Sequence, residues 1–390
     1  MASKPLVITA PTGRALAGRL ELPTGAPRAY AIFAHCFTCS KESKAAAYIS
    51  QSLAARGIAV LRFDFADTVF SSNIEDLVAA ASYLGEQGHA PQLLIGHSLG
   101  GTAVLAAAGR IEAARAVVTI GSPFRPSHVL HLISDPEKVR SAGEAQVDIG
   151  GRPVRIRREF LDDLERHDPA RATPALHKAL LVLHSPRDAI VPIDNAAQIF
   201  MAAKHPKSFV SLDDADHLLT RAADAAYAAE TIAAWASRYL AGGEAGAVAG
   251  VRVVEALQGK FAVDIFAGRH RVRADEPLSA GGGDTGPTPY DLLVAALGAC
   301  TAMTIRMYAD SKQLPLERVI VELAHEKVHA ADCAHCETKE GRIDRIERVV
   351  TLEGALDDAQ RAKLLEIADK CPVHRTLRSE VWSPTRLAGA

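Results

Sequence analysis

The chain has 390 residues, which is long for one hydrophobic core and suits two domains. Its 44 basic and 46 acidic side chains nearly cancel, so the composition carries no signature of a nucleic-acid-binding protein. No run of apolar residues approaches a membrane span, and the amino-terminal residues lack the apolar segment of a secretory signal. Six cysteines are too few for a disulfide scaffold. We therefore expect a cytoplasmic globular protein with no nucleic-acid or membrane partner.

Residues 1–241 alternate short apolar runs with alanine-rich stretches, and we predict that they form one domain. Strands that are apolar almost throughout are buried on both faces, as in a parallel sheet. Repeated βα units of this kind predict an α/β fold with a doubly wound, mostly parallel sheet. The predicted strands are 29–35, 58–65, 92–97, 116–121, 179–184 and 208–212, and the predicted helices are 43–56, 73–86 (with Asn73 as N-cap) and 99–110.

One segment, 123–174, interrupts this alternation. It contains four closely spaced arginines (Arg152, Arg155, Arg157 and Arg158) and no obvious buried strand. We predict a helical cap inserted above the sheet, and the alternative is a solvated excursion of the chain.

The composition changes after residue 241. Residues 242–250 are rich in glycine and alanine and predict a flexible linker. From 251 to 390 the predicted strands and helices are grouped apart, which favours an α+β domain. The predicted strands are 251–257, 261–266, 270–274, 318–328 and 342–352, and the predicted helices are 289–312 and 357–370.

A Gly-x-Ser-x-Gly motif lies between the strand at 92–97 and the helix that follows it. A serine at such a sharp turn has strained backbone geometry, and Gly96 and Gly100 avoid clashes with neighbouring backbone. The turn raises the hydroxyl of Ser98 above the sheet, where the helix N-terminus stabilises developing negative charge. This context favours a nucleophilic serine over a plain glycine-rich turn.

A nucleophilic serine needs a base and a group that orients the base. In this fold the acid and then the histidine follow the serine along the chain. Asp188 and His217 each follow a predicted strand, at the sheet edge where functional groups collect. We predict them as acid and base. Asp194 and Asp214 are alternatives for the acid, and His184 is predicted to be a packed histidine.

The loop His35-Cys36-Phe37-Thr38-Cys39-Ser40 resembles the His-Gly-Phe-x-Gly-Ser loop of α/β-hydrolases, with cysteine in place of both glycines. The resemblance implies an oxyanion hole made by the backbone N–H groups of Phe37 and Leu99. Cys36 and Cys39 would then lie beside the site. Either their oxidation to a disulfide reshapes the oxyanion hole, or they are small residues at glycine positions.

A second departure from hydrolases of this kind follows the strand that ends at Phe65. They continue with a Gly-x-Gly-x-Ser-type loop that borders the acyl pocket, and this loop is absent here. Its absence predicts a more open site or marks a deletion.

Three motifs in the second domain resemble the osmotically inducible protein C (OsmC) family, which includes the organic hydroperoxide resistance proteins. They are Gly-Pro-Thr-Pro-Tyr-Asp-Leu-Leu at 286–293, Leu-Gly-Ala-Cys-Thr at 297–301 and Lys-Cys-Pro-Val-His-Arg-Thr-Leu at 370–377. The match covers nearly all of 250–390, and the complete chain resembles a bacterial α/β-hydrolase–OsmC fusion. This resemblance implies a homodimer formed through the C-terminal domain and thiol peroxidase chemistry.

By the same resemblance, Cys300 attacks an organic hydroperoxide and Cys371 resolves the product as a disulfide. The residues themselves place Cys371 at a helix start, because Pro372 follows it, and such a site favours the thiolate. They leave Cys300 open, since its helical stripe also suits a buried core cysteine.

Other features bear on this chemistry. Well-characterised hydroperoxide reductases carry a glutamate where this chain has Tyr290, and Asp291 is the adjacent substitute. The arginine that would pair with the thiolate is not fixed by the sequence, and Arg269 and Arg271 are candidates by position. The domain could therefore have kept the dimer and lost the chemistry.

A further Cys-x-x-Cys pair, Cys333 and Cys336, is a redox pair, part of a metal site or an inert loop. Because zinc would need ligands from elsewhere, we predict no metal site.

Taken together, the sequence predicts a serine carboxylic-ester hydrolase that acts on small acyl esters and needs no cofactor. Its residues are Ser98, His217 and Asp188, with Phe37 and Leu99 at the oxyanion hole. The alternatives for the whole chain are a thiol-dependent organic hydroperoxide reductase and a C-terminal dimerisation module without chemistry.

Overall fold

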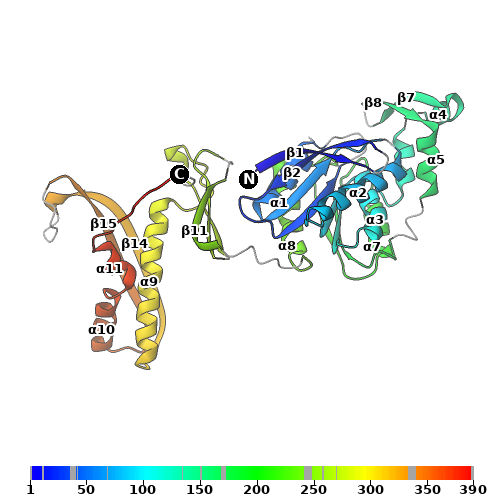
Figure 1. The fold of residues 1–390 in the computed structure, drawn as a ribbon. Coiled ribbons are helices and arrows are strands. Elements are labelled where there is room, and N and C mark those ends of the chain that lie inside the picture. The colour runs from blue at the N-terminus through cyan, green and yellow to red at the C-terminus, as the bar shows by residue number, and fades with distance from the viewer. Residues whose placement is uncertain are drawn as a thin grey trace. The chain divides into compact units, whose positions relative to one another are not determined.

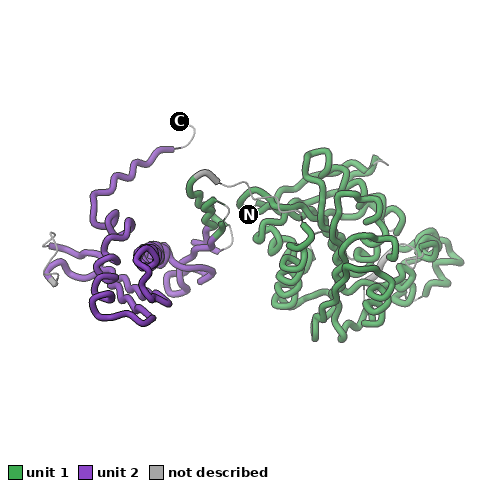
Figure 2. The backbone as a smooth tube through the Cα atoms, turned by 90° about the horizontal axis from the view of Figure 1, so that it is seen from below, with its two compact units in different colours: residues 1–258, 264–271 green, residues 259–263, 272–390 purple. Residues whose placement is uncertain are grey.

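The computed structural model describes residues 2–10, 13–35, 41, 43–67, 69–133, 135–149, 152–167, 173–240, 248–256, 259–268, 270–332 and 340–387. The chain forms two compact units, one of residues 1–258 and 264–271 and one of residues 259–263 and 272–390 (Figure 2). Most of the predicted linker at 242–250 lies outside the described residues. The domain boundary placed there stays a prediction.

The first unit is built around an eight-stranded sheet with the order β1-β2-β4-β3-β5-β6-β9-β10. The strands β4, β3, β5, β6, β9 and β10 are each parallel to their neighbours in this order, whereas β2 runs antiparallel to both β1 and β4. The predicted doubly wound, mostly parallel sheet is therefore confirmed. The strands are β1 (Ala2–Thr9), β2 (Ala15–Leu22), β3 (Ala29–Ala34), β4 (Ile58–Phe63), β5 (Leu93–His97), β6 (Ala116–Ile120), β9 (Ala179–His184) and β10 (Lys207–Ser211).

Helices cover both faces of this sheet (Figure 1). One core lies under α1 (Lys44–Ala55) and α8 (Ala222–Ala236). The other lies under α2 (Phe70–Glu86), α3 (Leu99–Ala107) and α7 (Asp194–Ala202), with η1 (Ala108–Arg110) after α3. Neighbouring strand residues enter opposite cores, as Ile32 and Phe33 do, which explains why the central strands are apolar at most positions.

The predicted N-cap of α2 is wrong. The helix begins at Phe70, and Asn73 is buried inside it. The N-cap residue, Val69, has no side-chain acceptor, and a distant residue takes its place. The carboxylate of Asp163 accepts hydrogen bonds from the Ser71 N–H at 2.8 Å and the Ser71 hydroxyl at 2.5 Å.

The cap segment is mixed rather than helical. Between η2 (Pro126–Leu132) and α5 (Arg158–Arg166) it contains α4 (Pro136–Ala142) and an antiparallel hairpin of β7 (Glu144–Ile149) and β8 (Arg152–Arg157). The hairpin was missed because its apolar residues alternate with polar ones, which include the exposed Arg155 and Arg157. Ala145, Val147 and Ile156 are buried in the same core as α2 and α3.

The second unit has the α+β architecture that the grouping of its elements predicts. It contains α9 (Pro289–Ser311), a long antiparallel hairpin of β14 (Leu316–His329) and β15 (Arg342–Gly354), α10 (Asp358–Ala368) and α11 (Pro372–Leu377). The sheet β11 (Val248–Glu255), β12 (Val263–Gly268) and β13 (His270–Ala274) is divided between the two units. Short turns of helix are η3 (Leu278–Ala280) and η4 (Ala330–Asp332).

Helix α9 is unusual for its apolar surface. By length and composition alone it could cross a membrane, and 28% of its most apolar window is buried in this unit. Leu293, Met303 and Met307 are exposed on it. A small core below it joins its C-terminal half, with Ile305 and Ala309, to α10.

Candidate active site

Ser98 stands at a strained turn between β5 and α3. Its backbone angles are φ 56° and ψ −131°, a left-handed conformation that costs a non-glycine residue about 1–3 kcal/mol. The glycines beside it are required, because a Cβ on Gly96 would lie 2.3 Å from the Gly100 carbonyl oxygen. A Cβ on Gly100 would lie 2.5 Å from the carbonyl oxygen of Ala34. The Ser98 N–H donates to the Ile120 carbonyl at 2.8 Å, which ties the turn to β6.

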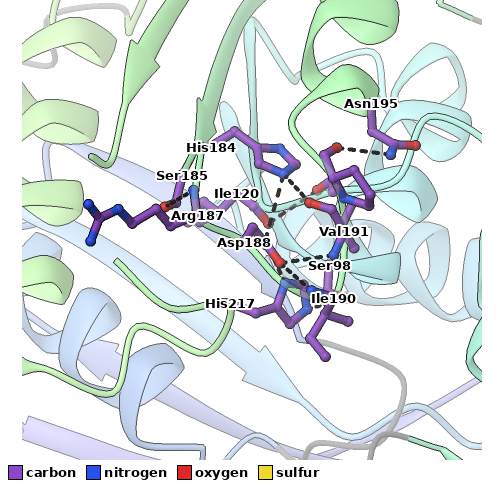
Figure 3. Close-up of polar contacts among 12 residues, drawn as sticks. Ser98, Ile120, His184, Ser185, Arg187, Asp188, Ile190, Val191, Asn195 and His217 are labelled. Carbon is purple, nitrogen blue, oxygen red and sulfur yellow. Dashed lines mark hydrogen bonds and ion pairs between the residues drawn. The ribbon is translucent and has the colours of Figure 1, made fainter. Parts of the chain in front are cut away.

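The structure brings the three predicted residues together (Figure 3). The Ser98 Oγ lies 3.0 Å from Nε2 of His217, and Nδ1 of His217 lies 2.8 Å from Oδ2 of Asp188. The other carboxylate oxygen of Asp188 accepts the N–H groups of Ile190 and Val191, each at 2.9 Å. Because the carboxylate only accepts, Nδ1 of His217 carries its proton, and Nε2 can accept the serine proton.

Hydrogen bonding keeps the buried Asp188 ionised. Burial alone would raise the pKa of this carboxyl, but the hydrogen bond from His217 and the two backbone N–H groups outweigh it and lower the pKa. Both alternative acids are exposed. Asp214 pairs with Arg221 at the surface, and Asp194 is exposed at the start of α7.

Two buried histidines flank this chain of hydrogen bonds, and the sequence analysis gave neither a role in the site. His184, packed as predicted, donates from Nε2 to the Val191 carbonyl at 2.8 Å and lies 3.6 Å from Asp188. His97 donates from Nε2 to the His217 carbonyl at 2.6 Å. Burial lowers the pKa of His184, and burial followed by the nearby His217 lowers the pKa of His97 to about 3. Both rings are therefore neutral near pH 7.

The loop that carries His217 is held in a strained conformation. Asp213 and Leu219, on either side, have φ angles of 45° and 50°. Each residue in this conformation costs about 1–3 kcal/mol of folding free energy, so contacts around the loop must hold it in place. Asp216 accepts the N–H of Leu218 inside the loop, and the Ser185 hydroxyl donates to the Asp213 carbonyl from outside it.

Of the two backbone donors predicted for an oxyanion hole, only Leu99 lies within the described residues. Leu99 is the first residue of α3, directly after Ser98, so its N–H lies at a helix N-terminus. Phe37, the second predicted donor, and Cys36 and Cys39 lie outside the described residues.

Residues on both sides of that loop are tied to the end of β4. The Lys41 N–H and ammonium donate to Asp64 at 2.6 and 2.5 Å, and His35 lies 3.6 Å from the same carboxylate. Burial would raise the pKa of Asp64, but the hydrogen bonds from His35 and Lys41 lower it strongly. Arg62, in a buried ion pair with Glu21, also donates to the Lys41 carbonyl.

In the second unit the two predicted redox cysteines are free thiols, and their side chains are in hydrogen-bonding contact. Cys371 is the N-cap of α11, as predicted, and its Sγ accepts the His374 N–H at 3.3 Å. Burial would raise the pKa of Cys371, but this N–H and the side chains of Cys300 and Thr301 lower it. Arg348, which the sequence analysis missed, donates to the Thr301 hydroxyl at 2.8 Å.

The remaining candidates make other contacts or are not described. Asp291 forms a capping box with Thr288 at the start of α9, and Arg271 pairs with Asp264 at 2.8 Å. Outside the described residues lie Arg269, Cys333 and Cys336.

Comparison with known proteins identifies both parts of the chain. A model described as "Alpha/beta hydrolase family" matches residues 31–231, and a model described as "OsmC-like protein" matches residues 281–384. The chain therefore belongs to the α/β hydrolase family and carries a C-terminal OsmC-like domain, as the sequence motifs imply. No curated protein matches it.

Solved structures agree with this assignment. The esterase domain of a Rhodothermus marinus protein is 52% identical, over 62% of this chain and 100% of that one, with a TM-score of 0.55. Est1E from Butyrivibrio proteoclasticus, 19% identical, shares the fold over 61% of this chain and 99% of its own, with a TM-score of 0.53. The α/β hydrolase GrgF from Penicillium sp. sh18, 17% identical, shares it over 62% and 100%, with a TM-score of 0.52.

Proposed function

We propose that the first unit hydrolyses carboxylic esters, with a preference for small acyl groups, through an acyl-enzyme on Ser98. The observation that carries this proposal is the continuous chain of hydrogen bonds from Ser98 through His217 to Asp188. The 52% identity to an esterase domain supports the reaction class. No cofactor is needed for this chemistry.

In the first half of the reaction, Oγ of Ser98 attacks the ester carbonyl carbon while Nε2 of His217 takes the hydroxyl proton. The tetrahedral oxyanion is held by the N–H of Leu99 and, by family resemblance, that of Phe37. Collapse expels the alcohol, which receives the proton from His217. Water then repeats these steps on the acyl-enzyme, and Asp188 stabilises the imidazolium formed in each half.

Hydrolysis of p-nitrophenyl acetate tests this proposal. Ser98→Ala should lower kcat by at least about 10⁴-fold, because the nucleophile is lost. Ser141→Ala, which removes an exposed hydroxyl bonded only within α4, is the matched control and should keep wild-type activity. Retained hydrolysis in Ser98→Ala would refute the proposal. A series of longer acyl esters and an amide defines the substrate range.

A second candidate activity, in the OsmC-like domain, is thiol-dependent reduction of organic hydroperoxides. The contact between Cys300 and Cys371, with the lowered pKa of Cys371, favours it. The Cys300 thiolate would attack the peroxide ROOH and break its O–O bond to give a sulfenic acid and the alkoxide RO⁻, which takes a proton from water to become ROH. The Cys371 thiol would then form the disulfide and release water, and an external dithiol would reduce the disulfide. Dithiol-dependent peroxide consumption that Cys300→Ser abolishes is required, and its absence would leave a module without this chemistry.

We also propose that the second unit forms a homodimer. The exposed side chains of Leu293, Met303 and Met307 on α9 form an apolar surface of the kind that a second copy covers in symmetric dimers. Met303→Glu with Met307→Glu should convert the full chain to monomer in light scattering. Met201→Glu, an equally exposed methionine on α7, is the control. An unchanged mass in the double variant would contradict the proposal.

A further inference from the structure

We propose that His97 is a positioning residue for ester hydrolysis, which holds the main chain of His217 at the distance that Ser98 requires. The inference rests on the proposed function of the first unit. It adds a fourth side chain to the three that the family pattern supplies.

The contact is short, buried and specific. His97 is 6% exposed, and its Nε2 lies 2.6 Å from the carbonyl oxygen of His217. A carbonyl only accepts, so Nε2 carries the hydrogen. The two imidazole rings lie 5.1 Å apart between centroids. Because burial keeps His97 neutral, no second positive charge faces the imidazolium that His217 becomes during the reaction.

The position of His97 in the chain gives this contact its effect. His97 directly precedes Ser98, so the end of β5 fixes the nucleophile covalently and the base by one hydrogen bond. Asp188 orients the imidazole ring of His217, and the end of β5 sets the position of its main chain relative to Ser98, where Oγ lies 3.0 Å from Nε2 of His217.

The loop that bears His217 needs such an external restraint. It contains two left-handed non-glycine residues, Asp213 and Leu219, which favour relaxation to another shape. The Ser185 hydroxyl holds one end of the loop at the Asp213 carbonyl. The hydrogen bond from His97 holds the loop at His217 itself, so its removal should release the base and leave the distant parts of the ester site unchanged.

Three substitutions separate positioning from packing. His97→Phe keeps a ring and removes the donor. His97→Gln places an amide N–H near the position of Nε2, whereas the amide of His97→Asn is too short to reach the carbonyl. We expect kcat for p-nitrophenyl acetate to fall about 10- to 100-fold in the Phe and Asn variants, with KM within about twofold of wild type. The Gln variant should recover most of kcat.

A second readout does not depend on the ester. A fluorophosphonate reacts with an activated serine, so its rate of attachment to Ser98, located by mass spectrometry, should follow the same order of variants. His89→Asn, a partly exposed histidine stacked on Tyr30, is the control and should behave as wild type.

The outcomes distinguish the two proposals. Loss of labelling and hydrolysis in Ser98→Ala together with wild-type kcat in His97→Phe would overturn only the role of His97. Equal kcat in the Gln and Asn variants would also overturn it, even if the Phe variant failed to fold. Full ester hydrolysis in Ser98→Ala would instead overturn the proposed function.

Discussion

Gly121, at the end of β6, offers the sharpest test of how tightly the site is packed. Its φ is +53°, and a Cβ there would lie 3.1 Å from Oδ2 of Asp188 and 3.4 Å from Nδ1 of His217. Gly121→Ala should therefore lower stability by about 1–2 kcal/mol, the cost of a left-handed alanine. It should also displace the hydrogen-bonded pair by a few tenths of an ångström. Since a misplacement of about 1 Å costs about 10²-fold, we expect kcat to fall about two- to tenfold.

A matched glycine isolates the second effect. Gly88 has φ +74° and no neighbour within 4 Å of its Cβ position, so Gly88→Ala imposes the same backbone strain without the contact. Urea unfolding should show a similar loss of stability in both variants, whereas only Gly121→Ala should lower kcat for p-nitrophenyl acetate. Equal kcat in the two variants would refute the claim that Gly121 makes room for the acid and the base.

Three further predictions concern charge and hydrogen bonding. Folding lowers the pKa of His97 from about 6.5 to about 3, so the unfolded chain binds a proton at His97 more readily than the folded chain does. Protonation of His97 therefore favours unfolding, and the free energy of unfolding should be highest above pH 6.5 and fall as the pH is lowered towards 3. Urea unfolding measured across this pH range should show the free energy of unfolding falling by up to about 1.4 kcal/mol per pH unit because of His97, and this part of the fall should be absent in His97→Phe. Parallel curves of unfolding free energy against pH for the wild type and His97→Phe would contradict the prediction. Arg62→Met should destabilise the first unit by about 3–5 kcal/mol in urea, since it leaves Glu21 buried without its partner, and adding Glu21→Leu should recover much of the loss. Thr301→Val removes a donor to Cys371 and should raise the pKa of that thiol, read from the pH dependence of its conversion to a mixed disulfide by a small methanethiosulfonate, and an unchanged profile would argue against this contact.

The central sheet could be predicted because its strands are buried on both faces. β4 and β9 are buried along their whole length and apolar at five of six positions, Arg62 and His184 being the exceptions, and helices that alternate with them leave few other folds. The hairpin of β1 and β2 was missed because one face is exposed, so the apolar residues alternate and are fewer. The hairpin in the cap was missed for the same reason.

In the candidate active site, too, the features that depend on neighbouring residues could be predicted, and those that depend on contacts between distant segments could not. Ser98 could be predicted because the strained turn that carries it requires glycines on both sides, which the sequence shows. Asp188 and His217 could be predicted because each follows a strand and they occur in the expected order after Ser98. The contacts of His97 and His184 join segments far apart in the chain, and composition does not reveal them. One signal was available, because each of these histidines ends a strand and immediately precedes a serine.

The start of α2 shows how the short connection after β4 bears on the cap. Only a few residues separate Phe65 from Phe70, so the helix begins close to the edge of the sheet, and Phe70 is fully buried. Phe70 packs edge-on against His167 just after α5, with ring centroids 4.8 Å apart, and Asp163 on α5 caps the helix through Ser71. These contacts anchor the cap at the side of the sheet where α2 begins.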